Sequence, residues 1–199
     1  MPDPVCLGFD ASAAHCAAAL LCGDRILAAR FETMAKGQAE RLFPMLEEML
    51  AEAGLGWRDL DVIGVGIGPG NFTGIRVAVA AARGLALSLG IPAIGIAATE
   101  AAAFGLPRPC RVVLPGRRGE VVWQDFGTDE QGDGGRPQQA ADGALPPGPA
   151  PSAPAVPLAE GIARRALARR HTDAPRPAPI YLRPADAAPS RDPAPVILP

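Results

Sequence analysis

The first hundred residues carry short apolar runs separated by turn residues, and the spacing within the runs alternates between strand-like and helical. Strand-like runs lie at residues 5–10, 17–22, 25–32, 62–67 and 94–96. Helical spacing covers residues 38–53, 73–89 and 99–104. Glycines end the first two of these segments, and Thr99 is expected to cap the third. Pro44 fits the first helix only in its first turn, so we expect regular helix from about Leu42. The resulting order, βββαβαβα, predicts one α/β lobe over residues 1–104.

The pattern changes after Phe104, where most of the chain's 23 prolines lie. Residues 111–114 and 121–126 predict a hairpin around Pro115-Gly116. Residues 128–157 are rich in glycine, proline, alanine and glutamine without a sustained period, so we expect a long mobile loop there. A helix over residues 158–170 and a proline-rich tail with an edge strand at 180–182 complete a smaller, eroded second lobe over residues 105–199.

The two long predicted helices are apolar around more of their circumference than one buried face requires. Phe43 widens the apolar arc of the first, and in the second the bulky residues Ile75, Val79, Ala82 and Leu89 lie opposite small ones. Such a helix is buried on both sides, either inside its own domain or against another chain, and we favour another chain. The predicted interface residues are Leu42, Met45, Leu46, Met49, Val77, Ala80, Gly84 and Ser88.

A glycine-rich turn, residues 68–74, joins a predicted strand to the second long helix. Its glycines allow a tight turn with positive φ, and we expect Thr73 to cap the helix. The turn could also cradle an anion on free amides, but it lacks the Lys-Ser or Lys-Thr pair of a P-loop. A structural turn is therefore favoured, and Asp10 is expected to accept amide bonds in a turn of its own. The residues of these turns, with their anion-binding alternative, are Asp10, Gly68, Gly70, Thr73, Gly74 and Arg76.

Composition offers little support for catalysis or for direct binding of nucleic acid. The formal net charge is −2, and the arginines at 164, 165, 169 and 170 fit the solvated face of a helix. The two histidines, His15 and His171, belong to no metal-binding spacing, so we expect neither a metal nor a catalytic residue. Cysteines in the predicted strands are expected to be reduced core residues of a cytoplasmic protein. The first residues lack a signal-peptide pattern, and no membrane association is expected.

Several segments occur in an order that resembles one protein family. They are VCLGFDAS at residues 5–12, QAERLFPML at 38–46, GPGNFTGIR at 68–76, RRGEVVW at 117–123 and IYLRP at 180–184. Together they resemble the TsaB (YeaZ) family, a bacterial component of the machinery that makes threonylcarbamoyladenosine in tRNA. The resemblance is dense from Val5 to about Ala103 and patchy afterwards.

The resemblance implies an actin-like (ribonuclease H-like) fold and a noncatalytic scaffold. Such a scaffold pairs with the catalytic subunit TsaD, recruits the ATPase TsaE, forms a homodimer when alone and meets tRNA only through the complex. It implies no cofactor of the chain's own and leaves open a nucleotide at the interface with the partner. The corresponding TsaD helix carries a His-x-x-x-His metal motif, whereas residues 38–42 here read QAERL. Where the family often has Asp-Ala-Arg, this chain has Pro115-Gly116-Arg117.

Two enzyme classes stay open beside the scaffold. An actin-like ATPase or sugar-kinase relative would use Asp10 and the glycine turn at residues 68–74. A relative of the M22-type metallopeptidases is a weaker alternative, because the histidine pair is missing from the sequence.

Overall fold

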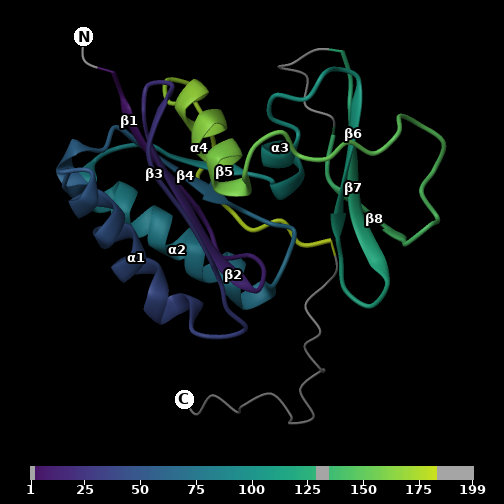
Figure 1. The fold of residues 1–199 in the computed structure, drawn as a ribbon, viewed down its shortest axis with the longest axis horizontal. Helices are drawn as coiled ribbons and strands as arrows, with labels where there is room; N and C mark the ends of the chain where they lie inside the picture. The colour runs from purple at the N-terminus through teal and green to yellow at the C-terminus, as the bar shows by residue number, and fades with distance from the viewer. Residues whose placement is uncertain (1–2, 129–134, 183–199) are drawn as a thin grey trace, which may run out of the picture.

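Residues 3–128 and 135–182 are described by a computed structural model, which arranges them in a larger and a smaller lobe (Figure 1). The larger lobe holds a five-stranded sheet of order β3-β2-β1-β4-β5. Its strands are β1 (Val5–Asp10), β2 (His15–Cys22), β3 (Arg25–Thr33), β4 (Val62–Gly66) and β5 (Ala93–Ile96). Strand β1 runs antiparallel to β2 and parallel to β4, which confirms the predicted α/β class.

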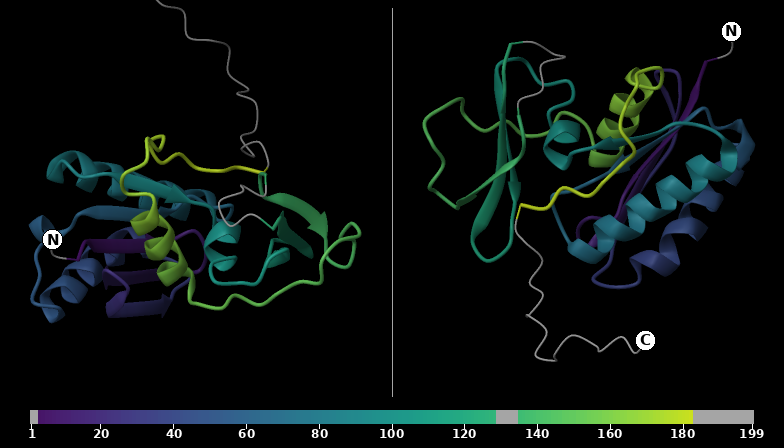
Figure 2. Two further views of the ribbon diagram at one scale, coloured as in Figure 1. Left: turned by 90° about the horizontal axis from the view of Figure 1, so that it is seen from above. Right: turned by 180° about the vertical axis from the view of Figure 1, so that it is seen from behind.

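Helices cover both faces of this sheet. Helices α1 (Gln38–Glu52) and α2 (Phe72–Leu89) lie on one face and α4 (Leu158–Ala168) on the other (Figure 2). The short α3 (Ala98–Ala102) and the 3-10 turn η1 (Trp57–Asp59) complete the helices of the described residues. The fold therefore buries β1 and β4 on both faces, as their continuous apolar runs require.

Four residues of α1 that the sequence analysis assigned to a partner interface belong to the core instead. Leu42, Met45, Leu46 and Met49 are fully buried against the sheet. Their spacing of three, four and seven residues places them on one side of the helix, which is the side that faces β2 and β3. Pro44 lies inside α1 on its exposed side, so the expectation that regular helix starts only near Leu42 was wrong.

Helix α4 packs on the larger sheet, although the sequence analysis placed it in the second lobe. Ile162, Ala163 and Ala166 are fully buried against the sheet. Gly8 and Gly64, paired across β1 and β4, allow this helix to come close to the strands: a Cβ on Gly8 would lie 2.7 Å from the Cβ of Ala163. Residues 142–157 thus return the chain from the smaller lobe to the larger one.

The smaller lobe is a three-stranded antiparallel sheet of order β6-β7-β8. Strands β6 (Cys110–Pro115) and β7 (Glu120–Phe126) form the predicted hairpin. Strand β8 (Gln138–Ala141) lies inside the predicted loop at 128–157 and pairs with β7, so part of that expectation was wrong. Residues 129–134 of the predicted loop lie outside the described residues. Arg111 holds the proline-rich stretch further on, because its guanidinium donates to the carbonyl of Pro146 and to both oxygens of Asp125.

Two further expectations about local structure were wrong. Thr99 lies inside α3 rather than capping it, and its hydroxyl donates across the lobes to Gln124 of β7. The tail forms no edge strand up to Leu182, although the Ile180 amide donates to the carbonyl of Ile67 at 2.8 Å. Both contacts tie the second half of the chain to the first lobe.

Helix α2 is long and apolar enough, by length and composition alone, to cross a membrane. In the structure one side of α2 packs on the sheet, and its residues Ile75, Ala78, Val79 and Ala82 are buried there. Packing in the core therefore accounts for the bulky face of this helix.

All four cysteines are free thiols, and Cys22 is the one that is only half-buried. Burial raises the pKa of Cys6 to about 12 and that of Cys16 to about 11, because the thiolate would lose its water. We expect a thiol reagent such as Ellman's to titrate Cys22 alone at about pH 8 in the folded protein, and all four thiols in urea. The variant Cys22→Ser should lose the fast reaction. A second fast thiol in that variant would contradict this burial.

Candidate functional site

The glycine turn packs tightly against the turn between β1 and β2. A Cβ on Gly70 would lie 2.3 Å from the carbonyl oxygen of Ser12, and one on Gly74 would lie 1.8 Å from that of Ala11. Gly68 adopts φ +89°, which favours glycine. The backbone of the glycine turn therefore packs directly against the turn between β1 and β2. The glycines make this close contact possible, because a side chain at Gly70 or Gly74 would clash with it.

Asn71, not Thr73, caps helix α2. The Asn71 side-chain oxygen accepts the amides of Thr73 and Gly74 at 3.0 and 3.3 Å. Asparagine suits this position as well as threonine does, and the helix begins one residue earlier than predicted. The composition of the turn does not show which of the two residues is the cap.

Asp10 is fully buried at the end of β1 and holds the next turn together. Its Oδ1 accepts the amide and the hydroxyl of Ser12, both at 2.9 Å, and lies 2.8 Å from Nε2 of His15. The sequence alone does not reveal this contact of His15, because the pair forms only when β2 folds back along β1. Oδ2 of Asp10 packs against Gly66, where a Cβ would lie only 1.9 Å away.

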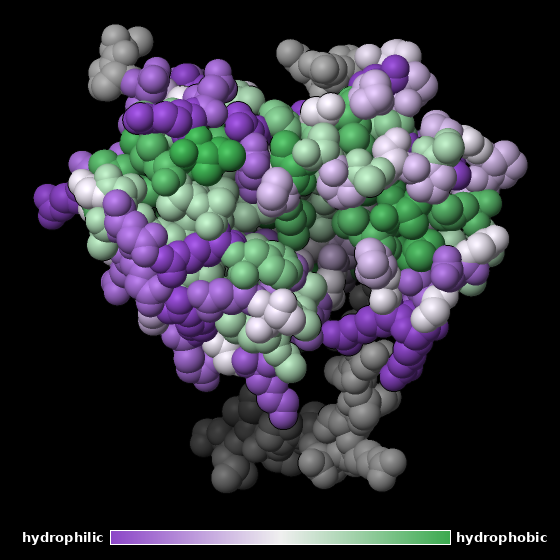
Figure 3. All heavy atoms as spheres, viewed as in Figure 1, coloured by the Kyte–Doolittle hydropathy of each residue, from purple (hydrophilic) through white to green (hydrophobic). Residues whose placement is uncertain are grey.

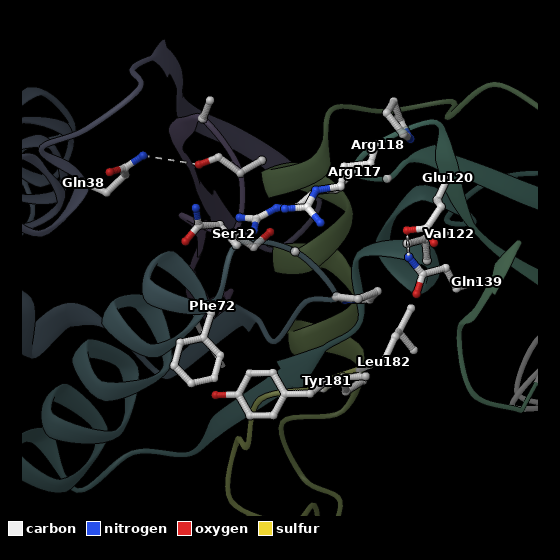
Figure 4. A pocket seen from close by; sticks show the side chains of 18 of the residues that line it. Ser12, Gln38, Phe72, Arg117, Arg118, Glu120, Val122, Gln139, Tyr181 and Leu182 are labelled. Carbon is white, nitrogen blue, oxygen red and sulfur yellow. Dashed lines mark hydrogen bonds between the residues drawn. The ribbon is translucent and has the colours of Figure 1, made fainter. Parts of the chain in front are cut away.

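A cleft of about 790 Å³ lies between the two lobes, and the molecular surface is visibly hollowed there (Figure 3). Ser12, Gln38 and Phe72 line it from the larger lobe, and Arg117 and Arg118 from the turn between β6 and β7 (Figure 4). Tyr181 of the C-terminal segment closes the side near Phe72. Asp10 is not among the residues that line the cleft.

Arg76 fixes an aromatic pair at the edge of this cleft. Its guanidinium carbon lies 3.6 Å from the centroid of the Phe72 ring, and its Nε donates to the Tyr181 hydroxyl at 2.9 Å. The two rings are 5.0 Å apart between centroids. Arg76, a candidate anion ligand in the sequence, is therefore occupied with holding the C-terminal segment on α2.

A second depression, about 400 Å³ in volume, runs between α1 and α2 on the outer surface. Of the predicted interface residues, it contains Val77, Ala80, Gly84 and Ser88. Ala39 and Phe43 of α1 form its other wall. Val77 is half-buried, and the other three predicted residues are exposed. We call this depression the α1–α2 groove.

Within residues 3–128 and 135–182, no group of three or more His, Cys, Asp or Glu side chains is arranged to hold a metal ion. The absence of a metal site and the absence of catalytic residues stay predictions.

The family model described as TsaD: tRNA N6-adenosine threonylcarbamoyltransferase matches residues 31–145. The tRNA threonylcarbamoyladenosine biosynthesis protein TsaB of Escherichia coli (strain K12) is 34% identical over 131 residues, covering 63% of this chain and 56% of that protein. An uncharacterized protein of Mycobacterium tuberculosis (strain ATCC 25618 / H37Rv) is 34% identical over 180 residues, covering 82% of this chain and 83% of its own length. This chain thus spans little more than half the length of the E. coli protein.

The crystal structure of YeaZ from Pseudomonas aeruginosa superposes with a TM-score of 0.67 at 25% identity, covering 90% of this chain and 100% of that one. A protein from the same organism, described as uncharacterized with similarity to peptidase YeaZ, superposes with a TM-score of 0.69 at 26% identity and the same coverage. Both likenesses extend over the two lobes rather than over the larger sheet alone.

Proposed function

The chain belongs to the TsaB (YeaZ) family, with its actin-like fold, and from this premise we propose that it takes part in the biosynthesis of threonylcarbamoyladenosine in tRNA. In this proposal it is a noncatalytic subunit that pairs with TsaD, and the pair recruits TsaE. The complex transfers a threonylcarbamoyl group from threonylcarbamoyl-adenylate to N6 of an adenosine. The chain itself meets tRNA only through the complex, in the cytoplasm.

The main structural support for pairing with TsaD is the α1–α2 groove. Exposed small residues on α2, at Ala80, Gly84 and Ser88, allow the backbone of a partner helix to approach closely. Phe43 is 40% exposed beside them, and Leu87, which precedes Ser88 on α2, is 86% exposed. Large apolar side chains around a shallow apolar depression are typical of a protein interface. When TsaD is absent, a second copy of the chain occupies the same groove.

The burial of the polar groups that a reaction would need supports a noncatalytic role. Asp10 and His15, the carboxylate and imidazole that lie together, are both buried, and neither is among the residues that line the cleft. An actin-like ATPase or a sugar kinase needs such an acid at the edge of its nucleotide cleft. The buried position of Asp10 therefore disfavours that alternative, and the sequence itself lacks the histidine pair of a metallopeptidase.

Reconstitution tests the activator role. The assay contains TsaD, TsaE, the enzyme that makes threonylcarbamoyl-adenylate, threonine, bicarbonate, ATP and tRNA, with or without this chain. We expect omission of the chain to lower modification at least about tenfold, because pairing shifts TsaD toward its competent conformation. Modification is measured by mass spectrometry of digested tRNA.

Two results would contradict the proposal in different ways. Full modification without the chain would reject the activator role. Modification by the chain alone, from preformed threonylcarbamoyl-adenylate, would reject the noncatalytic role.

A further inference from the structure

The cleft between the lobes carries charged and aromatic groups that pairing through the α1–α2 groove does not use. Arg117 and Arg118 project into it from the turn between β6 and β7, opposite Phe72 and Tyr181 (Figure 4). We propose that this cleft binds a nucleoside monophosphate without a metal ion, the phosphate at Arg117 and Arg118 and the base at the Phe72–Tyr181 pair.

The arginines supply the anion-binding half of the site. No hydrogen bond or ion pair joins the guanidinium of Arg117 or Arg118 to another residue of 3–128 and 135–182, and both residues are exposed. Nearby, Glu120 is held by a hydrogen bond from Gln139. Two guanidinium groups against one engaged carboxylate make the cleft positive in a chain whose net charge is −2. Each guanidinium can bind a phosphate through two parallel N–H bonds.

Backbone geometry aims these side chains at the cleft. Arg118 adopts φ 55°, the one left-handed residue other than glycine among the described residues. The turn around it is closed by hydrogen bonds between Gly116 and Glu120 and between Glu120 and Arg117. Asn71 and Phe72, at the amino end of the 18-residue helix α2, face the same space and add positive potential from the helix dipole.

The aromatic pair supplies a platform for a planar base. Phe72 is 37% exposed and Tyr181 43% exposed, and both rings line the cleft. Arg76 covers one face of the Phe72 ring and donates to the Tyr181 hydroxyl, so both rings are held in place before a ligand arrives. Bases stack on such rings with little regard to their identity, so the structure assigns the class of ligand and not the base.

The same geometry favours a monophosphate over a metal-bound triphosphate. Asp10, the acid at the end of β1, is fully buried against Gly66 and does not line the cleft, and Glu120, which does line it, is already bonded to Gln139. Arg76 is already engaged, which leaves two cationic side chains for the ligand. A single phosphate matches that charge. The cleft volume of about 790 Å³ lies in the range of small-molecule pockets.

Calorimetry with the full chain and AMP tests the proposal. We expect saturable binding below about 1 mM that EDTA does not change. The double variant Arg117→Gln/Arg118→Gln should weaken binding at least about tenfold, since each lost charge-assisted bond costs about that factor. The matched control Arg25→Gln/Arg58→Gln removes two exposed arginines elsewhere and should bind AMP as the native chain does. Thermal unfolding of both variants checks that the fold is retained.

Ligand fragments separate the two halves of the site. Tyr181→Leu should weaken AMP binding but leave binding of ribose 5-phosphate unchanged, because only AMP has a base. No AMP binding, binding that requires Mg²⁺, or equal affinity in the Arg117→Gln/Arg118→Gln variant would each overturn the proposal. Binding is measured on the isolated chain, so its failure leaves the pairing with TsaD untouched, and failed pairing leaves the nucleotide site untouched.

Discussion

Replacing Ala80 by arginine is expected to abolish association with TsaD, and with a second copy of the chain, while the fold survives. Ala80 is exposed on α2 and lies between Phe43 and Gly84 in the α1–α2 groove. An arginine there fills the depression and places a charge where an apolar partner must pack. A residue at the centre of an interface changes affinity by about a hundredfold or more. Light scattering and size-exclusion chromatography of the mixed proteins measure the loss.

A second substitution reaches the same groove without adding charge. Nothing lies within 4 Å of a Cβ placed on Gly84, so Gly84→Leu fits the isolated chain and removes a helix-weakening glycine. It should nonetheless block a close helix–helix approach. The matched control is Ala168→Arg, an exposed alanine of α4 on the opposite face of the sheet, which should pair normally.

These variants also connect the groove to tRNA modification. Ala80→Arg and Gly84→Leu should lower modification in the reconstituted assay in proportion to the pairing they lose, whereas Ala168→Arg should not. Unfolding of either groove variant would show that the small face of α2 is core. Intact association of both would place the interface elsewhere and remove the main physical support for the scaffold.

The sequence predicted most of the larger lobe because its signals are local. Alternation and apolar runs located all five strands to within two residues at each end. The same local signal misled the interpretation of α1. Its wide apolar arc contains the ordinary core stripe of Leu42, Met45, Leu46 and Met49, and Phe43 is the one large apolar residue of α1 that lines the groove. Periodicity shows that a helix has an apolar face, but which part of that face is buried depends on how the helix packs on the sheet.

Features that depend on distant parts of the chain could not be predicted in this way. Helix α4 returns to the first sheet after a proline-rich segment, and β8 has no apolar side chain larger than alanine but gains its hydrogen bonds from β7. The contact of His15 with Asp10 and that of Arg76 with Tyr181 likewise need the folded chain. Gly8 was a sequence signal for the packing of α4 on this sheet, because a glycine inside a buried strand indicates that another segment approaches the backbone closely.

Gly8→Val is expected to destabilise the protein by about 3 kcal/mol or more, because it forces α4 away from the sheet. A Cβ at this position would lie 2.7 Å from the amide nitrogen of Ala163 and 2.8 Å from its Cα. These are backbone atoms of a helix and cannot turn aside. Valine has a better strand propensity than glycine, but that preference is worth only about 1 kcal/mol, so the clash decides the sign. Urea unfolding followed by circular dichroism measures the change.

Two comparisons attribute the loss to the contact between α4 and the sheet. Gly127→Val adds the same side chain where nothing lies within 4 Å, and its stability should stay close to that of the native chain. Gly64→Ala meets the Cβ of Ala166 at 2.8 Å, so Ala166→Gly should partly rescue it, although glycine alone weakens a helix by about 1 kcal/mol. Two results would mean that α4 does not pack on β1 and β4. In one, the stability losses of Gly64→Ala and Ala166→Gly simply add in the double variant; in the other, Gly8→Val is as stable as the native chain. Without that packing, α4 would no longer bring the C-terminal segment of the chain back beside α2, and the cleft would lose that wall.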